Sequence, residues 1–328
     1  MQSGHRTYLN LFFTFVCAWS AMLTAPAAAQ PYPNKPVRVI VTFPPGGTPD
    51  IYGRILAQEL TTLWKQPVVV ENKTGASGTI GTDFVAKASP DGYTLLFAAD
   101  ASITIAPNLV RNIPYNPVKD LTPIANAVAG PFVLLAHPSF PANDMKEFIA
   151  LAKAQPGKIS YASSGPGGQQ HLSMETVRHM AGIEVAHIPY KGFGQGLGDV
   201  MAGHVPLIFG GITASIQLAK SGKLKALGVT SAIRSQALPN VQAIAETLPG
   251  FRIDAWYGFM GPPAMPRELV MKINADVAAI VKRPEFQKRM IDDALESALG
   301  TPEEFATQIA ADLGSWARLI KAVNVKVD

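Results

Sequence analysis

The chain has 328 residues, a formal net charge of +4 at pH 7 and 48% hydrophobic residues. The charge is spread evenly, and no run of Lys and Arg interleaved with aromatic residues indicates a nucleic-acid partner. The single cysteine excludes an intramolecular disulfide and a multi-thiolate zinc site.

The first 29 residues have the pattern of a secretory signal segment. A short basic start at His5 and Arg6 precedes the apolar run Leu9–Leu23, and Ala27–Ala29 fits a cleavage site. The run is shorter than the roughly 20 residues of a membrane span, although a retained anchor is the alternative. We therefore expect an exported, periplasmic chain that begins at Gln30.

Removal of this segment also removes Cys17, the only cysteine. The mature chain then has no disulfide and no cysteine nucleophile, so its core alone stabilises the fold. About 300 mature residues are enough for two lobes of ordinary domain size.

The first part of the mature chain alternates strands and helices. Short apolar runs predict strands at Val37–Phe43, Val68–Val70 and Thr94–Ala98. Apolar stripes at helical spacing lie between them, at Ile51–Leu60 and Ile80–Ala88. This order predicts an α/β unit with a mostly parallel sheet covered by helices.

A second unit of the same kind begins near Phe132. Its predicted strands are Val133–Ala136, Ile159–Ala162, Val185–Ile188, Val205–Phe209 and Ala226–Thr230, with helices around Met145–Ala152 and Met174–Met180. A strand at Phe251–Phe259 leads back, and helical stripes follow at Leu269–Ile280 and Phe305–Ile320. We expect lobe 1 at residues 30–130 and 256–328, and lobe 2 at 131–255.

The segment Phe43–Asp50 joins the first strand to the first helix. Thr48 suits the N-cap, Asp50 lies in the first turn, and Gly46 and Gly47 leave backbone amides open. Such a loop at the end of a parallel strand, beside a helix N-terminus, favours an anion. A well-capped turn without a ligand is an equally good interpretation of the residues alone.

The Gly-rich loop Ser163–Gly168 has the same arrangement in the second unit. Its hydroxyls and amides could hold the other side of a carboxylate, or it could be a simple turn. It matches neither a phosphate-binding P-loop nor a dinucleotide-binding Gly pattern. The candidate ligand residues here are Ser163, Ser164, Gly165, Gly167 and His171.

Further candidates surround these two loops. Thr74–Gly78 could line a cleft or only cap its helix. Ala99 and Ser102 follow the third strand and are candidate walls, and Tyr190 could add a ring and a hydroxyl.

Catalytic patterns are nearly absent. The chain has no Gly-x-Ser-x-Gly elbow and no His-Glu-x-x-His helix. His171 and Glu175 share a helix face, but two ligands do not make a metal site. We expect no catalytic residue, no metal and no cofactor, and keep a serine hydrolase that uses Ser163 or Ser164 as the rival.

Several ordered motifs resemble the Bug family, the extracytoplasmic substrate-binding proteins of tripartite tricarboxylate transporters. The motifs are Tyr32–Arg38, Phe43–Asp50, Val68–Asn72, Gly75–Gly78, Ala86–Leu96, Tyr161–Gly165 with His171 and Leu172, His187–Gly192 and Ala226–Thr230. They cover essentially the whole mature chain. Gly192–Gly194 departs from the usual proline-containing continuation.

The resemblance implies a two-lobe periplasmic binding protein (type II-like) whose lobes are joined by two crossing strands. It implies that both lobes grip a small carboxylate through loop amides, hydroxyls and water, and that permease subunits in the membrane are partners. Transferred to this chain, the ligand loops are Gly46–Asp50 and Ser163–Gly167, with Ala99–Ser102 and Tyr190 as walls. A sensory adaptor for a membrane kinase is a further alternative, and the carboxylate is left open.

Overall fold

The computed structural model describes residues 32–325, so the predicted signal segment lies outside the described residues. From Lys35 onward the chain forms one compact unit. Within the described part, no helix combines the length and apolar character needed to cross a membrane.

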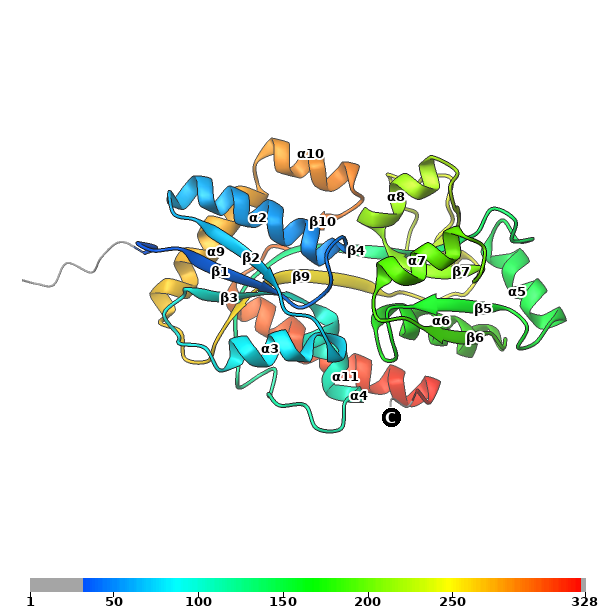
Figure 1. Ribbon diagram of the computed structural model, residues 1–328, viewed down its shortest axis with the longest axis horizontal. Coiled ribbons are helices and arrows are strands. Elements are labelled where there is room, and N and C mark those ends of the chain that lie inside the picture. Colours follow the sequence, from blue (N-terminus) through cyan, green and yellow to red (C-terminus); the bar gives the residue numbers. More distant parts are fainter. Residues whose placement is uncertain (1–31, 326–328) are drawn as a thin grey trace, which may run out of the picture. The chain divides into compact units, whose positions relative to one another are not determined.

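The first sheet contains five main strands in the order β2-β1-β3-β9-β4 (Figure 1). Their bounds are β1 Val37–Val41, β2 Val68–Asn72, β3 Thr94–Ala99, β4 Thr122–Ala136 and β9 Asp254–Gly261. β1 is parallel to β2 and β3, whereas β9 is antiparallel to both β3 and β4. The short strand β10, Glu296–Ser297, also pairs with β4. We call this sheet and its helices the first half.

The second sheet has the order β4-β7-β5-β6, and β8 pairs with β4 as well. Its further strands are β5 Ser160–Ser163, β6 Ala186–Pro189, β7 Leu207–Gly211 and β8 Lys225–Val229. β5 is parallel to β6 and β7, and β4 is antiparallel to β7 and β8. We call this sheet and its helices the second half.

Helices flank both sheets. Those of the first half are α2 Thr48–Trp64, α3 Thr79–Ala86, α4 Ala106–Leu109, α9 Arg267–Val281, α10 Pro284–Asp292 and α11 Pro302–Val323. Those of the second half are α5 Met145–Ala154, α6 Gln169–Ala181, α7 Phe193–Met201 and α8 Ile212–Lys220. Short helical turns occur at η1 Ala76–Gly78, η2 Ala101–Ile105 and η3 Ile244–Glu246.

Strand β4 connects the halves. Up to Pro131 it pairs with β9, and from Phe132 it pairs with β7. The chain returns between β8 and β9, where the Ile253 amide donates to the Thr230 carbonyl. Figure 1 shows β4 and β9 running side by side toward the second half. The exact lobe limits and the two crossing strands stay a prediction.

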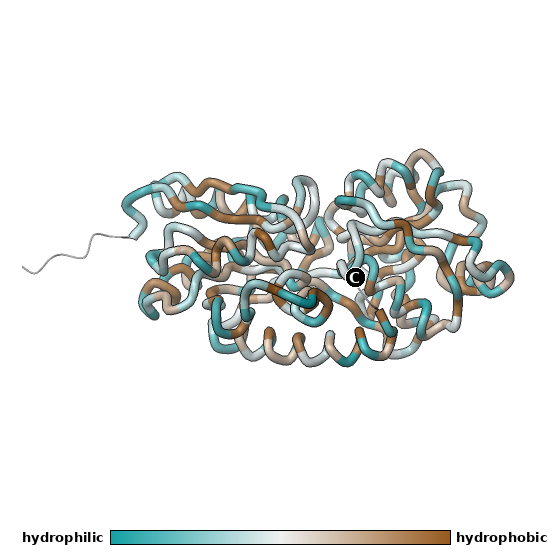
Figure 2. Tube along the Cα trace, turned by 60° about the horizontal axis from the view of Figure 1, so that its bottom comes forward, coloured by the Kyte–Doolittle hydropathy of each residue, from teal (hydrophilic) through white to brown (hydrophobic). Residues whose placement is uncertain are grey.

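Apolar residues of both halves are buried between sheets and helices. The fully buried aromatic side chains include Tyr52 and Phe97 in the first half and Tyr161 and Phe209 in the second. Figure 2 shows hydrophobic segments along the interior strands, with hydrophilic residues on outer loops and helix faces. Burial of this kind, at about 25 cal/mol per Å² of apolar surface, stabilises the α/β layers.

The expected strands and helical stripes are present, with three differences. The sheets are mixed rather than mostly parallel, because β4 and β9 run against their neighbours. Strand β4 begins at Thr122, ten residues before the predicted start of the second unit. Helices α4, α7, α8 and α10 were not predicted.

Candidate functional site

A cavity of about 100 Å³ lies among loops of both halves. Its lining residues are Phe43, Pro44, Pro45, Gly47, Thr48, Pro49, Ala99, Ala101, Phe132, Ser164, Gly168, Gln169, Gln170, Phe193, Gly194, Gly211, Ala214 and Tyr257. Four of the predicted ligand residues are among them: Gly47, Thr48, Ala99 and Ser164. The cavity therefore joins the two Gly-rich loops that the sequence singles out.

Four helices, α2, α6, α7 and α8, begin beside this cavity. Their N-cap residues are all glycine, namely Gly47, Gly168, Gly192 and Gly211, and none of the four has a side-chain cap bond among the described residues. By contrast, Asp144 caps α5 and Thr301 caps α11 through their side chains. First-turn amides without a side-chain acceptor, together with the helix dipoles, favour an anion.

Hydroxyl groups add to these donors. Thr48 Oγ1 is buried and has no hydrogen-bond partner among the described residues. Burial raises the pKa of Tyr257, and the nearby Asp100 raises it further, so this hydroxyl keeps its proton. No Lys, Arg, Asp, Glu or His occurs among the lining residues of the described chain. An anion in this cavity would therefore be stabilised by dipoles rather than by a cationic side chain.

Asp50 acts on the loop and does not line the cavity. Its carboxylate accepts hydrogen bonds from the Gly46 amide at 3.1 Å, from Arg54 Nε at 3.0 Å and from Asn72 Nδ2 at 2.9 Å. Asn72 also donates to the Phe43 carbonyl at 3.0 Å. Burial alone would raise the pKa of Asp50, but the bonds from Arg54, Asn72 and Gly46 lower it. The carboxylate therefore stays ionised and fixes the turn.

Hydrogen bonds within the loop Ser163–Gly168 and to two histidines fix its conformation. Ser163 Oγ donates to the Gly165 carbonyl and accepts from the Gly165 amide, both at 3.1 Å, and lies 2.6 Å from His187 Nε2. The Gly167 amide donates to His171 Nδ1 at 3.0 Å. Ser163 and His171 are buried and do not line the cavity, while Ser164 lines it.

The two predicted hydroxyl walls have internal partners instead. Ser102 Oγ donates to the Ala99 carbonyl at 3.0 Å, and Tyr190 Oη donates to Asp199 Oδ2 at 2.6 Å. Neither residue lines the cavity. Both hydroxyls therefore stabilise the protein beside the cavity through internal hydrogen bonds.

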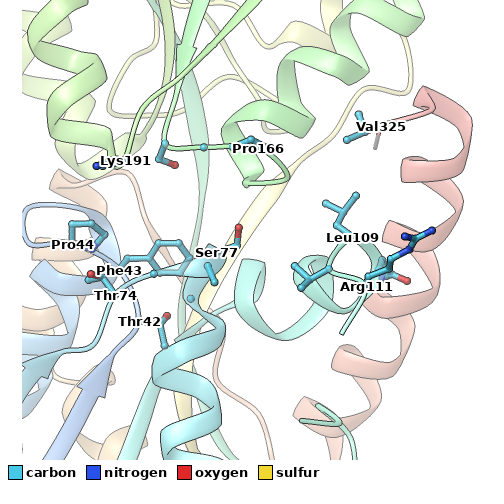
Figure 3. Close-up of a pocket in the computed structure, with 18 of the residues that line it drawn as sticks. Thr42, Phe43, Pro44, Thr74, Ser77, Leu109, Arg111, Pro166, Lys191 and Val325 are labelled. Atoms are coloured by element: carbon cyan, nitrogen blue, oxygen red, sulfur yellow. The ribbon is translucent and has the colours of Figure 1, made fainter. Parts of the chain in front are cut away.

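A larger groove of about 1250 Å³ adjoins the cavity and shares Phe43, Pro44 and Ser164 with it. Its other lining residues are Thr42, Thr74, Gly75, Ala76, Ser77, Gly78, Asn108, Leu109, Val110, Arg111, Asn112, Gly165, Pro166, Lys191, Gly192 and Val325. Figure 3 shows Lys191 and Arg111 on different walls. Lys191 and Arg111 give the groove positive charge, and no acidic residue of the described chain lines it. The groove therefore attracts anions toward the cavity.

Sequence reasoning missed about half of the lining. Gln169 and Gln170 directly follow the predicted loop, and Gly211 comes two residues after the predicted strand Val205–Phe209, so the same loop argument could have found them. Phe132 and Tyr257 lie inside strands and give no local signal, since only the assembled sheets bring them to the cavity.

Comparisons with known proteins agree with this geometry. Residues 52–325 match the family model of the tripartite tricarboxylate transporter family receptor, TctC. The structure of Rpa4515 from R. palustris with adipate has 29% identity and a TM-score of 0.87, over 90% of this chain and 99% of that one. Periplasmic binding protein BugD has 34% identity and a TM-score of 0.85, over 90% and 99% of the two chains.

A third structure, MatC from Rhodopseudomonas palustris with bound malate, has 28% identity and a TM-score of 0.82, covering 88% of this chain and 100% of that chain. These relatives confirm the α/β periplasmic binding protein fold and identify the chain as a receptor rather than a hydrolase. The chain belongs to the Bug family of solute receptors, the TctC proteins of tripartite tricarboxylate transporters.

Proposed function

We propose that this receptor works in the periplasm, where it captures a small carboxylate in the cavity between its two lobes and delivers it to the membrane subunits of a tripartite tricarboxylate-type transporter. The observation that carries the proposal is the set of four helices with glycine N-caps around one cavity. Their amides and dipoles favour an acid group without a cationic side chain.

The relatives support the ligand class, because solved structures of the family hold adipate and malate. The apolar lining, which includes Phe43, Phe132 and Phe193, suits the carbon skeleton of such an acid. A ligand that contacts both halves binds the closed arrangement more tightly than an open one, and so shifts the population toward closure.

Calorimetry on the purified mature chain tests the capture step. Adipate and malate serve as probes, and their dimethyl esters are the matched neutral controls. We expect binding of at least one diacid and no binding of its ester, because the ester lacks the charge that the helix N-termini favour. Equal affinity for acid and ester would contradict the proposal.

Uptake into vesicles that contain the transporter's membrane subunits tests delivery. We expect labelled ligand to accumulate only when the receptor is added. Ligand-dependent phosphorylation by a membrane kinase, without receptor-dependent uptake, would favour a sensory adaptor instead.

A further inference from the structure

Two histidines stack beneath the loop Ser163–Gly168. The rings of His171 on α6 and His187 on β6 have centroids 4.1 Å apart and planes 9° apart. The ring of Tyr161 on β5 stacks on His187 at 5.0 Å. Neither imidazole lines the cavity, so neither is a ligand contact in this arrangement.

Each imidazole bonds one end of the loop. His171 Nδ1 accepts the Gly167 amide, and His187 Nε2 lies within hydrogen-bond distance of Ser163 Oγ. The neighbouring residues Ser164 and Gly168 line the cavity. The histidine pair therefore contacts the second loop at residues adjacent to those that line the cavity.

The bond to Gly167 requires a neutral ring. Because His171 Nδ1 accepts a hydrogen bond, the ring proton is on Nε2, which lies 3.7 Å from Glu175 Oε1. A protonated imidazole carries hydrogen on both nitrogens and accepts from neither. Proton uptake by His171 would therefore break its bond with the loop.

The surroundings oppose proton uptake. Burial lowers the pKa of His171 to about 4, and the charge of Arg178 adds to the effect. Burial also lowers the pKa of His187 to about 4, the charge of His171 lowers it further, and Glu175 acts in the opposite direction. Glu175 is itself engaged by Arg178 and by Tyr161 Oη, which donates to it at 2.8 Å.

We propose that His171 and His187 are positioning residues, whose neutral stack holds the loop Ser163–Gly168 in its ligand-binding conformation, and that protonation of His171 releases the loop. This inference rests on the proposed function for its link to the ligand. The hydrogen bonds from the two histidines to the loop do not involve a ligand. The positioning role and the proposed carboxylate ligand can therefore be refuted separately.

Amide hydrogen exchange of Gly167, followed by NMR without ligand, tests the positioning. Because the bond needs a neutral ring, we expect the protection factor of the wild type to fall at least about tenfold between pH 7 and about pH 4. We expect H171L to lose protection at every pH, since leucine offers no acceptor. H171N should keep protection with a flat profile, because its amide oxygen accepts without titrating.

The control is H179N, because His179 is exposed near the C-terminal end of α6, about two turns beyond His171. It should retain the wild-type profile. A Gly167 amide that stays protected in H171L, or an unchanged pH profile in H171N, would overturn the proposal. If H171L fails to fold, H171N and the wild-type profile still decide the question.

Affinity for adipate, measured in parallel from pH 7 to about pH 4, tests the link to the ligand. Protonation of adipate itself lowers its affinity for both proteins over this interval, so the difference between them is the measure. Affinity that falls more steeply in the wild type than in H171N, in step with Gly167 protection, supports the proposal. Affinity that falls equally in both would overturn the coupling. Absence of adipate binding at pH 7 would count against the proposed ligand class and leave the exchange test of the stack intact.

Discussion

At the scale of single residues, Asp50 shows how a buried charge serves a site that it does not contact. Three donors from the loop, from α2 and from β2 converge on its carboxylate. A buried carboxylate with this many partners contributes to stability, whereas its removal leaves the donors unpaired. The turn before α2 therefore depends on Asp50 for the direction of its amides.

We expect D50A to weaken ligand binding at least about tenfold and to lower the free energy of unfolding by about 2 kcal/mol, because the Gly46 amide and the Asn72 side chain lose their acceptor. Calorimetry with the wild-type ligand and urea unfolding measure the two effects. D292A is the control, since Asp292 forms an exposed pair with Lys288 and should change neither quantity appreciably. Unchanged affinity in D50A would refute this role.

At the scale of elements, the helix starts around the cavity differ from those with side-chain caps, although α3, α4, α9 and α10 also lack a side-chain cap bond among the described residues. Helices α5 and α11 have side-chain caps, which serve stability alone. The four helices around the cavity have glycine N-caps and leave first-turn amides to another acceptor. An element that binds a ligand at its N-terminus gives up part of the stability that a side-chain cap would add.

Substitution at the α6 N-cap tests this division. The backbone of Gly168 is extended, and a Cβ there meets nothing closer than 3.5 Å. We expect G168D to keep or raise the melting temperature, because the new carboxylate caps α6, and to weaken carboxylate binding at least about tenfold through competition and like charge. Thermal melting and calorimetry measure both.

The reciprocal variant is D144A on α5. It should cost about 1 kcal/mol of stability, because the Glu147 amide loses its cap, and leave ligand affinity unchanged. Equal loss of affinity in the two variants would show that general stability, rather than the free helix start, controls binding.

The sequence predicts some of the helices and strands and misses others. The first strands and helices follow from apolar spacing alone, and both Gly-rich loops were placed beside a cavity. The first part of β4 escaped prediction because Pro123, Gly130 and Pro131 are unfavourable in strands, and its neighbours β9 and β10 are distant in sequence. Helix α7 escaped because Gly194, Gly196 and Gly198 lower its helix propensity.

At the scale of the whole molecule, three close approaches join the halves around the cavity. A Cβ on Gly211 would lie 2.7 Å from Thr48 Oγ1, and one on Gly192 would lie 3.3 Å from Pro44 Cγ. The third approach is a hydrogen bond of 2.7 Å from Gln169 Nε2 to Asp100 Oδ2. No local pattern in the sequence predicts these contacts, because each joins residues distant along the chain.

Asp100 makes this junction sensitive to pH. Its carboxyl is buried, and Oδ1 has no hydrogen-bond partner among the described residues. Burial raises the pKa of Asp100 well above its usual value, and the charges of Asp312 and Asp254 raise it further. The folded state therefore holds a proton at pH values where the unfolded chain has released it, and stability falls as pH rises through this interval.

We expect D100N to remove this dependence, because asparagine is neutral at every pH and its oxygen can still accept from Gln169. In the wild type, the Asp100 contribution to the free energy of unfolding should fall by about 1.4 kcal/mol per pH unit above its ordinary pKa, until the raised pKa is reached. Urea unfolding of both proteins at several pH values between about 4 and 8 measures the difference. D292N, at an exposed pair, should retain the wild-type profile. If D100N and the wild type have parallel profiles, Asp100 is ionised in the folded state, and the junction between the halves contains a buried charge that Gln169 and the Ala101 amide partly satisfy.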